Sequence, residues 1–244
     1  MTSPSLTGRV AVVAGATSDI GRALCFRLAG AGARLCLLGR DSDALEFVAQ
    51  NVRNLADGVG VYRIDLTDDG APAEVGVRLR AEVGRVDVLI HSAGAFHMGP
   101  HAEADIEDLD RQYRTNVRGP YLLTQALLPL LRKCHGQIVF MNSTVGLEAR
   151  AGVGQYAATQ HALRAIADAL RAEVNADGVR ILSVYLGRTA TARQAHIFRL
   201  EGRRYAPELL VQPADVAHMV MAALLVPRTA EVTEIRMLPL MKSY

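Results

Sequence analysis

The chain is short of cysteine and of long apolar runs, and each shortage excludes a class of protein. Cys25, Cys36 and Cys134 are scattered without the spacing of a disulfide framework or a metal site. The longest unbroken apolar run, Met219 to Val226, is far shorter than the ~20 residues that a membrane-spanning helix needs. The first five residues lack the basic start and apolar stretch of an export signal. We therefore expect a protein of the reducing cytoplasm, with no bound metal and no membrane partner.

Charge is nearly balanced as well. The 27 basic and 25 acidic residues leave a net charge of +2, which is too weak to favour nucleic acid or an anionic membrane surface as a partner. A small molecule is the better expectation for what the protein acts on. Among the basic residues only Lys133 and Lys242 are lysines, so few places in the chain can supply an ammonium group.

Short apolar runs rich in β-branched residues alternate with helical patterns along the chain. Runs that are apolar throughout and separated by helices indicate a parallel sheet covered on both faces. We predict an α/β, Rossmann-like doubly wound sheet of about seven strands, and a single domain over residues 1–244. The predicted strands are Arg9–Ala14, Arg34–Leu38, Val59–Ile64, Val86–His91, Gln137–Asn142, Arg180–Leu186 and Glu234–Leu238. The only irregular late stretch, about 190–210, is the candidate for a mobile lid over the substrate.

The turn after the first predicted strand, Gly15-Ala16-Thr17-Ser18-Asp19-Ile20-Gly21, is typical of a loop that binds the pyrophosphate of a dinucleotide. Gly15 and Gly21 allow a tight bend and a close approach of backbone to phosphate, and the helix that follows offers N–H donors to the anion. Asp19 brings a carboxylate near the expected phosphate oxygens. We expect Asp19 to turn outward and to cap the helix.

A hydroxyl and a phenol later in the chain suit proton transfer. Reduction of a carbonyl needs an acid that gives a proton to the oxygen, and a second group that steadies the developing alkoxide. Tyr156 is suited to the first role, and Ser143, after the fifth predicted strand, to the second. Gln160 lies on the same face of the predicted helix as Tyr156.

These residues, with the glycine-rich turn, His91-Ser92-Ala93-Gly94 and Asn116, resemble the short-chain dehydrogenase/reductase family across nearly the whole chain. The resemblance implies an oxidoreductase that interconverts a carbonyl and an alcohol on a small molecule. It implies the catalytic positions Asn116, Ser143, Tyr156 and Gln160, with Asn116 holding a water in the proton relay. The implied cofactor contacts are Gly15, Thr17, Ser18, Asp19, Ile20, Gly21, Arg40, Asp65, Leu66, Ala93, Gly94, Tyr156, Gln160, Gly187, Thr189 and Thr191.

Family members commonly form dimers or tetramers through the helix that carries the tyrosine and through the helix before it. The resemblance therefore implies a homodimer or homotetramer. In this chain the tyrosine-bearing helix offers Ala157, Leu163, Ala167 and Leu170, which suit either a core or an interface. His91 replaces a family asparagine, and we expect it to be a structural hydrogen-bonding residue and not a catalyst.

The end of the second predicted strand, Leu37-Leu38-Gly39-Arg40-Asp41, bears on the choice of cofactor. An acidic side chain there would accept hydrogen bonds from the ribose and repel a 2′-phosphate. Gly39 instead leaves room, and Arg40 can pair with that phosphate, although Asp41 could partly neutralise it. NADP(H) is therefore favoured over NAD(H).

Position 160 departs from the family pattern, because an amide stands where the family has a lysine. An ammonium group would favour the phenolate of Tyr156, and an amide supplies little of that effect. Lys133 and Lys242 lie elsewhere, and Arg188 could lend charge but cannot shuttle protons. Three interpretations stay open: a slow NADPH-dependent reductase with an alkaline-shifted reverse reaction, a catalytically silent NADP-binding or scaffold protein, and an introduced substitution or an error at position 160.

Overall fold

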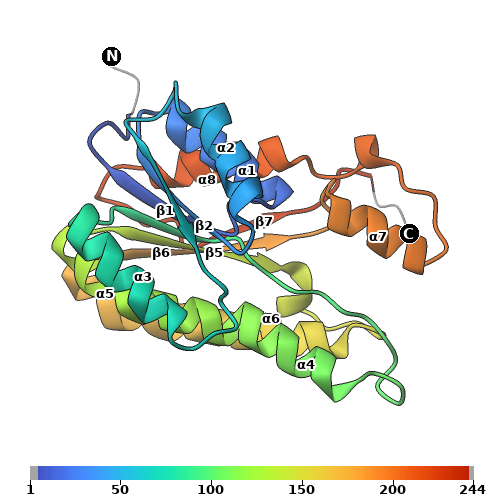
Figure 1. Cartoon of the computed structure of the whole chain (residues 1–244). Coiled ribbons are helices and arrows are strands. Elements are labelled where there is room, and N and C mark those ends of the chain that lie inside the picture. Colours follow the sequence, from blue (N-terminus) through green and yellow to red (C-terminus); the bar gives the residue numbers. More distant parts are fainter. Residues whose placement is uncertain (1–4, 242–244) are drawn as a thin grey trace.

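The computed structural model describes residues 5–241 and shows one parallel sheet between two layers of helices (Figure 1). The sheet has seven strands in the order β3-β2-β1-β4-β5-β6-β7, which confirms the predicted doubly wound α/β fold. The strands are β1 (Val10–Ala14), β2 (Arg34–Gly39), β3 (Val59–Arg63), β4 (Val88–His91), β5 (Gln137–Ser143), β6 (Arg180–Leu186) and β7 (Glu234–Met237). The α-helices are α1 (Asp19–Gly30), α2 (Ser42–Val52), α3 (Ala71–Glu82), α4 (Ile106–Tyr113), α5 (Gly119–Lys133), α6 (Gly154–Val174), α7 (Ala192–Leu200) and α8 (Pro213–Leu224). No helix within this described range is long and apolar enough to cross a membrane.

Every predicted strand is present, and its bounds differ from the prediction by at most two residues. The largest difference is at β4, which begins at Val88. Just before it, the buried carboxylate of Asp87 accepts a hydrogen bond from the backbone N–H of Val10 at 2.8 Å and pairs with Arg85 at 2.7 Å. Asp87, which lies inside the predicted strand, therefore joins the beginnings of β1 and β4.

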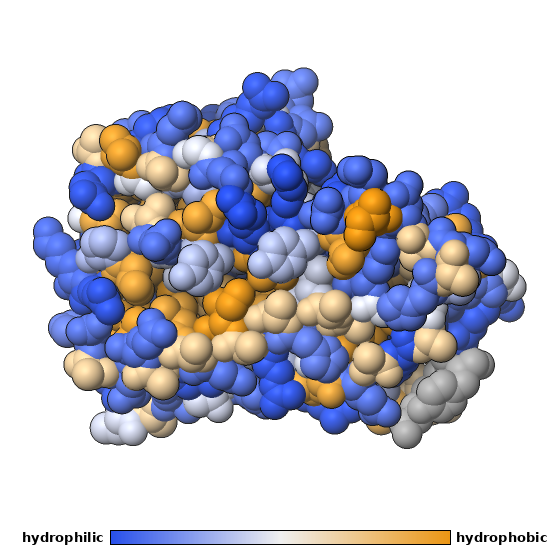
Figure 2. Space-filling model, turned by 90° about the horizontal axis from the view of Figure 1, so that it is seen from below, coloured by the Kyte–Doolittle hydropathy of each residue, from blue (hydrophilic) through white to orange (hydrophobic). Residues whose placement is uncertain are grey.

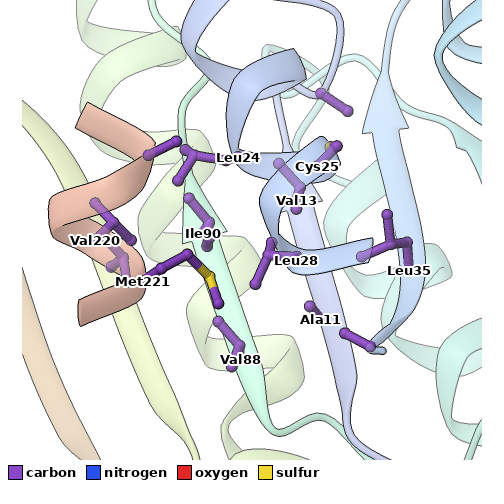
Figure 3. Packing of buried hydrophobic residues seen from close by; sticks show 14 of the residues in the cluster. Ala11, Val13, Leu24, Cys25, Leu28, Leu35, Val88, Ile90, Val220 and Met221 are labelled. Carbon is purple, nitrogen blue, oxygen red and sulfur yellow. The ribbon is translucent and has the colours of Figure 1, made fainter. Parts of the chain in front are cut away.

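Alternate residues of β1 enter opposite cores, as the twofold period of a strand requires. Ala11 and Val13 face the layer formed by α1, α2 and α8, whereas the other three residues face α3, α5 and α6. Figure 3 shows the first core, where Leu28 of α1 and Val220 of α8 lie over Ile90 of β4. Both faces of the sheet are thus covered, which explains why its strands are apolar throughout.

The order of the strands reverses between β1 and β4. The chain leaves β1 toward β2 and β3 on one side, and continues from β4 toward β5, β6 and β7 on the other. Connections that diverge in this way open a crevice at the carboxyl ends of the two strands, and ligands of open α/β sheets bind there. The fold therefore points to the loops after β1 and β4 as the place to look for a site.

Residues 190–210 are not irregular, contrary to the prediction. They contain α7 and a short 3₁₀ helix, η4 (Pro207–Leu209), and Figure 1 shows α7 standing out at one end of the sheet. The segment folds around Phe198, which is buried beneath the guanidinium groups of Arg188 and Arg203. An aromatic anchor of this kind gives a short helix a small core of its own. That the segment moves as a lid stays a prediction.

The core contains one buried histidine, His91, at the end of β4. Its exposed fraction is 2%, its Nε2 lies 2.9 Å from the hydroxyl of Thr124, and its ring stacks on Phe140. Nδ1 has no hydrogen-bond partner within residues 5–241. Burial lowers the pKa of His91 to about 3, because the charged imidazolium would lose its hydration. These contacts suit the structural role expected for His91.

Acid should therefore weaken the fold through His91. The folded histidine stays neutral down to about pH 3, while the unfolded chain takes up a proton near its ordinary pKa of about 6.5. Between these values the unfolded state binds more protons, so the free energy of unfolding should fall by roughly 1 kcal/mol for each unit of decrease in pH. Urea unfolding of the wild type and of His91→Asn between about pH 4 and 7 measures this slope. Equal slopes for the two proteins would contradict the prediction.

Candidate active site and cofactor site

The loops that follow β1 and β4 touch at the point where the strand order reverses. Gly15 has a φ of +82°, and a Cβ added there would lie only 2.4 Å from the backbone nitrogen of Ala93. A Cβ added to Gly21 would lie 2.1 Å from the carbonyl oxygen of Gly15. Side chains are therefore excluded at both positions. The predicted phosphate-binding turn has the close backbone packing that such a turn requires.

Ser18, and not Asp19, caps α1, so the predicted cap is wrong. The Ser18 hydroxyl accepts a hydrogen bond from the backbone N–H of Gly21 at 3.0 Å and donates to the carbonyl oxygen of Gly15 at 2.9 Å. Ser18 has the extended backbone of a capping residue, whereas Asp19 is already the first residue of the helix. Thr17 and Ile20, on either side, are partly buried.

The carboxylate of Asp19 joins the start of α1 to the start of α7. Its Oδ2 accepts a hydrogen bond from the backbone N–H of Ala192 at 2.8 Å, and its Oδ1 pairs with Arg22 at 2.5 Å. Ala192 is the first residue of α7, and a negative charge is favourable beside the N-terminus of a helix. Asp19 thus pairs with Arg22 on its own helix through one oxygen and stabilises the start of a different helix through the other.

Exposed arginines lie at the carboxyl ends of β2 and β3. Arg63 pairs in register with Gly39, and its Nε donates to the carbonyl oxygen of Arg40 at 3.2 Å. Asp41 forms no ion pair with Arg40 among residues 5–241, and its Oδ1 caps α2 by accepting hydrogen bonds from two backbone N–H groups. The sequence analysis does not include Arg63 among the predicted site residues. The register of the two neighbouring parallel strands places it beside Arg40.

Asp65 follows β3 and carries a carboxylate that stays ionised. Burial acts to raise the pKa of Asp65, but the hydrogen bonds from Thr67 and the charges of Arg40 and Arg63 outweigh it and lower that pKa. The Thr67 backbone N–H and hydroxyl each donate to this carboxylate at 2.9 Å. Leu66 is buried, and a Cβ added to Gly119 would lie 2.7 Å from it. Asp65 and Leu66 therefore have fixed places beside the β2 end.

Tyr156 and Ser143 form a hydrogen-bonded pair at the carboxyl end of β5. Ser143 is the last residue of the strand, and its hydroxyl is hydrogen-bonded to the Tyr156 phenol on α6. Burial raises the pKa of Tyr156, and the opposing effects of the Arg193 charge and the Ser143 hydrogen bond do not cancel the increase. The phenol is therefore protonated at neutral pH. It is poised as an acid.

Asn116 is placed by a π-helical turn, η1 (Arg114–Arg118), between α4 and α5. Its amide accepts a hydrogen bond from the backbone N–H of Ala95 at 2.7 Å and donates to the Ala95 carbonyl oxygen at 2.9 Å. It also donates to the Thr159 hydroxyl at 3.1 Å, and the side chain of Gln160 donates to that hydroxyl at 3.4 Å. Thr159, which the sequence did not single out, therefore joins two predicted residues. Thr159 could have been identified from the sequence only because it directly precedes Gln160.

Three consecutive residues after β4 are each held by a different side chain of the candidate site. The pairs are Gly94 with Arg193, Ala95 with Asn116, and Phe96 with Tyr156. The first is a hydrogen bond from the guanidinium to a carbonyl oxygen, and the last is an edge-to-face ring contact with centroids 4.9 Å apart. This short loop connects the β4 end, α6 and α7.

Arg193, and not Arg188, is the arginine whose charge acts on Tyr156. Arg188 pairs with Glu201 at 2.8 Å and lies over the ring of Phe198, so its charge is used within the α7 segment. No pattern in the sequence singles out Arg193, because it approaches the site only through the packing of α7.

The remaining predicted cofactor residues lie after β6. The backbone N–H of Gly187 donates to the carbonyl oxygen of Met237 at 2.8 Å, and the Thr189 hydroxyl donates to the carbonyl oxygen of Gly187 at 3.1 Å. Thr191 caps α7 by accepting a hydrogen bond from the backbone N–H of Gln194 at 3.1 Å. Among residues 5–241 there is no cluster of three or more His, Cys, Asp or Glu side chains that could hold a metal ion.

The fold and this group of residues describe an α/β protein with a dinucleotide-type turn beside a serine–tyrosine pair. The family model for short chain dehydrogenases matches residues 9–201. The chain therefore belongs to the short-chain dehydrogenase family, as its motifs implied. A relative from Bos taurus, dehydrogenase/reductase SDR family member 7B, is 34% identical over an alignment of 227 residues, and the match covers 88% of this chain and 70% of the relative. An uncharacterised oxidoreductase from Staphylococcus aureus strain N315 is 30% identical over 235 residues, or 96% of this chain and 98% of the relative.

Solved structures with nicotinamide cofactors are similar to the whole chain. An alcohol dehydrogenase from the archaeon Thermococcus sibiricus, in complex with 5-hydroxy-NADP, is 25% identical with a TM-score of 0.85, and the match covers 97% of this chain and 99% of that one. A short chain dehydrogenase from Shigella flexneri, in complex with NADP, is 28% identical with a TM-score of 0.88 and covers 96% and 99%. Cofactors of this kind are thus bound by proteins of the same family and fold.

Proposed function

We propose that the protein is an NADP(H)-dependent oxidoreductase that interconverts a carbonyl and an alcohol on a small molecule. The observation that carries this proposal is the pairing of the Tyr156 phenol on α6 with the Ser143 hydroxyl at the end of β5, beside the point where the strand order reverses. An acid and a second hydrogen-bonding group are the two elements that a carbonyl reduction needs. The glycine-rich turn at the same edge of the sheet has the form that holds a pyrophosphate.

Each residue has a defined task in this reaction. The cofactor, when bound, supplies the hydride for reduction or accepts it for oxidation. During reduction the Tyr156 phenol gives its proton to the carbonyl oxygen, while the Ser143 hydroxyl steadies the charge that develops there. In the reverse direction the Tyr156 phenolate accepts the proton of the alcohol. Asn116 fixes the backbone of Ala95 and, through Thr159, the neighbouring turn of α6.

The weak point of this site is position 160. Gln160 is 4% exposed and carries no charge, and its side-chain amide donates a hydrogen bond to the Thr159 hydroxyl. We propose that Gln160 occupies the place of the family lysine and that proton transfer is impaired as a result. Because the phenol is protonated at neutral pH, the impairment falls on oxidation more than on reduction.

The two directions should therefore differ in their response to pH. Reduction uses the protonated phenol and should vary little from about pH 6 to 8, whereas oxidation uses the phenolate and should increase roughly tenfold per unit up to a pKa above its ordinary value of about 10. Initial rates for one carbonyl–alcohol pair, measured across this range in both directions, check the prediction. Tyr156→Phe is the control and should lose both activities while still binding NADPH. An oxidation rate that levels off below about pH 8 would contradict a raised pKa.

A lysine at position 160 should restore oxidation. We expect Gln160→Lys to increase the oxidation rate at neutral pH on the order of tenfold and the reduction rate by less, because its charge would favour the phenolate. Gln160→Met is the matched control, since it has similar length and no charge. If the lysine variant gains nothing on any substrate that the wild type reduces, position 160 does not limit turnover.

The preference for NADP(H) is supported by the arginines at the ends of β2 and β3. Arg40 and Arg63 are both exposed there, Gly39 leaves space, and one oxygen of the Asp41 carboxylate is bound to the start of α2. A 2′-phosphate on the adenosine ribose would find two cations at this place. Asp65 remains ionised nearby, and the two arginines offset its charge.

Removing one cation should weaken NADPH more than NADH. Arg40→Ala should lose a charge-assisted contact and bind NADPH roughly ten- to a hundredfold less tightly, with little change for NADH. Fluorescence titration of both cofactors measures the two dissociation constants. Arg53→Ala is the control, because Arg53 is an exposed arginine directly after α2, where it pairs with Glu46. Equal losses for both cofactors would show that Arg40 does not read the phosphate.

A catalytically silent NADP-binding or scaffold protein is the second candidate function. The uncharged, buried Gln160 favours it, because an amide can hydrogen-bond a ribose without activating Tyr156. This candidate and the first share the cofactor site and differ in turnover. Measurable NADPH affinity with no hydride transfer over a broad panel of carbonyl compounds would favour the silent protein.

Self-association stays a prediction, and the two helices implied for it are α6, which carries Tyr156, and α5 before it. Leu163 and Ala167 of α6, which suited a core or an interface, lie in the core of the chain itself. Exposed apolar residues occur instead on neighbouring helices, including Val77 of α3 and Tyr121 of α5. Figure 2 shows apolar side chains gathered between polar ones on the face that these helices form. We propose this face as the place where a second copy binds.

A further inference from the structure

Two consecutive residues at the start of α7 are held by two different parts of the candidate site. The backbone N–H of Ala192 donates to the Asp19 carboxylate, which belongs to the glycine-rich turn after β1. The guanidinium of Arg193 donates to the carbonyl oxygen of Gly94, after β4. The first turn of α7 therefore spans the two loops between which a dinucleotide would lie.

The guanidinium of Arg193 lies beside groups that contact the reacting residues. A Cβ added to Gly94 would lie 3.5 Å from Arg193 Nη1 and 3.4 Å from Asn116 Oδ1, so both side chains flank the same backbone position. Phe96, two residues later, packs its ring against the ring of Tyr156. The short loop of residues 94–96 thus has the arginine at one end and the phenol at the other.

We infer that Arg193 is a positioning residue that supplies Tyr156 with the positive charge that Gln160 does not provide, and that Asp19 holds α7 where this charge is effective. The inference rests on the function proposed above. It links the Asp19 carboxylate, which binds the backbone N–H of Ala192, to the charge missing at position 160, because Arg193, which follows Ala192, carries a positive charge. A charge on α7 acts on the site only while α7 is docked, unlike a lysine built into α6.

The electrostatics of the site agree with this role. The charge of Arg193 acts to lower the pKa of Tyr156 against the larger effect of burial. The Ser143 hydroxyl is the other polar group that acts on the phenol. On the neighbouring elements, His97 follows Phe96 and contacts Asp108 at 2.9 Å, and the ring of His101 lies against Gly154 at the start of α6. All of these groups are kept in the variants below, so a difference between two variants does not come from their removal.

The direct test is the titration of the Tyr156 phenol, which needs no turnover. NMR of the protein labelled with ¹³C in its tyrosine rings, with Tyr156→Phe to assign the resonance, gives the titration with and without NADP⁺. Arg193→Gln should move it to higher pH, and Arg193→Lys should return it toward the wild type. Arg199→Gln is the matched control, since Arg199 is an exposed arginine on the same helix.

The same variants predict a kinetic effect. For a substrate that the wild type turns over, Arg193→Gln should slow alcohol oxidation at a fixed pH roughly three- to tenfold, because less phenolate is present. Carbonyl reduction should change less. With Gln160→Lys in place, the same substitution should have a smaller effect, since the lysine then supplies the charge.

Asp19 provides an independent check. Asp19→Gly removes the contact with Ala192, and it should move the Tyr156 titration in the same direction as Arg193→Gln, with no further shift when the two are combined. Asp19→Asn keeps an oxygen that can accept the Ala192 hydrogen bond, and it should behave more like the wild type. Circular dichroism confirms that each variant is folded.

The outcomes separate this inference from the proposed function. If Arg193→Gln leaves the Tyr156 titration unchanged, the inference is overturned, whatever the turnover. If the titration shifts but the wild type reduces no carbonyl compound, the inference about the charge stands and the proposed reaction fails. If Arg193→Gln has the same effect whether position 160 holds glutamine or lysine, Arg193 does not replace the charge that is missing at position 160. That result would also overturn the inference.

Discussion

The contact between the glycine-rich turn and the end of β4 is the constraint on which the candidate site depends. Gly15 approaches the backbone of Ala93 so closely that no side chain fits between them. This contact brings the loop after β1 against the loop after β4 at the reversal of strand order. The residues that hold Gly94, Ala95 and Phe96 then connect this junction to α6 and α7. A shift of either loop would change the surroundings of the phenol.

The balance of burial against charge decides how Tyr156 behaves. Burial raises its pKa, so the group is well suited to give a proton and poorly suited to take one. Position 160 supplies an amide to the Thr159 network instead of a charge. The charge that does act on the phenol comes from a different helix. The chemistry of the proposed site is therefore coupled to the packing of α7, which the Asp19 carboxylate and the Phe198 anchor both stabilise.

The ends of β2 and β3 are a second place where neighbouring strands act together. Arg40 is the residue from which the sequence analysis favours NADP(H). The register of β3 against β2 places a second arginine, Arg63, beside it. Asp41, which could partly neutralise Arg40, caps the start of α2 through one carboxylate oxygen. Membership of the short-chain dehydrogenase family, and NADP complexes of similar structures, are consistent with this arrangement without fixing the cofactor of this chain.

Sequence alone determined the seven strands, their order of appearance, the glycine turn and the serine–tyrosine pair, because apolar period and residue type are local properties. It could not determine which side chain would satisfy the start of α1, since Ser18 and Asp19 are both good capping residues. Nor could it identify Arg193 as a partner of Tyr156, because Arg193 lies 37 residues later in the chain and reaches the site only through the docking of α7. Electrostatic partners depend on distance in space and on burial, and only the tertiary structure decides both.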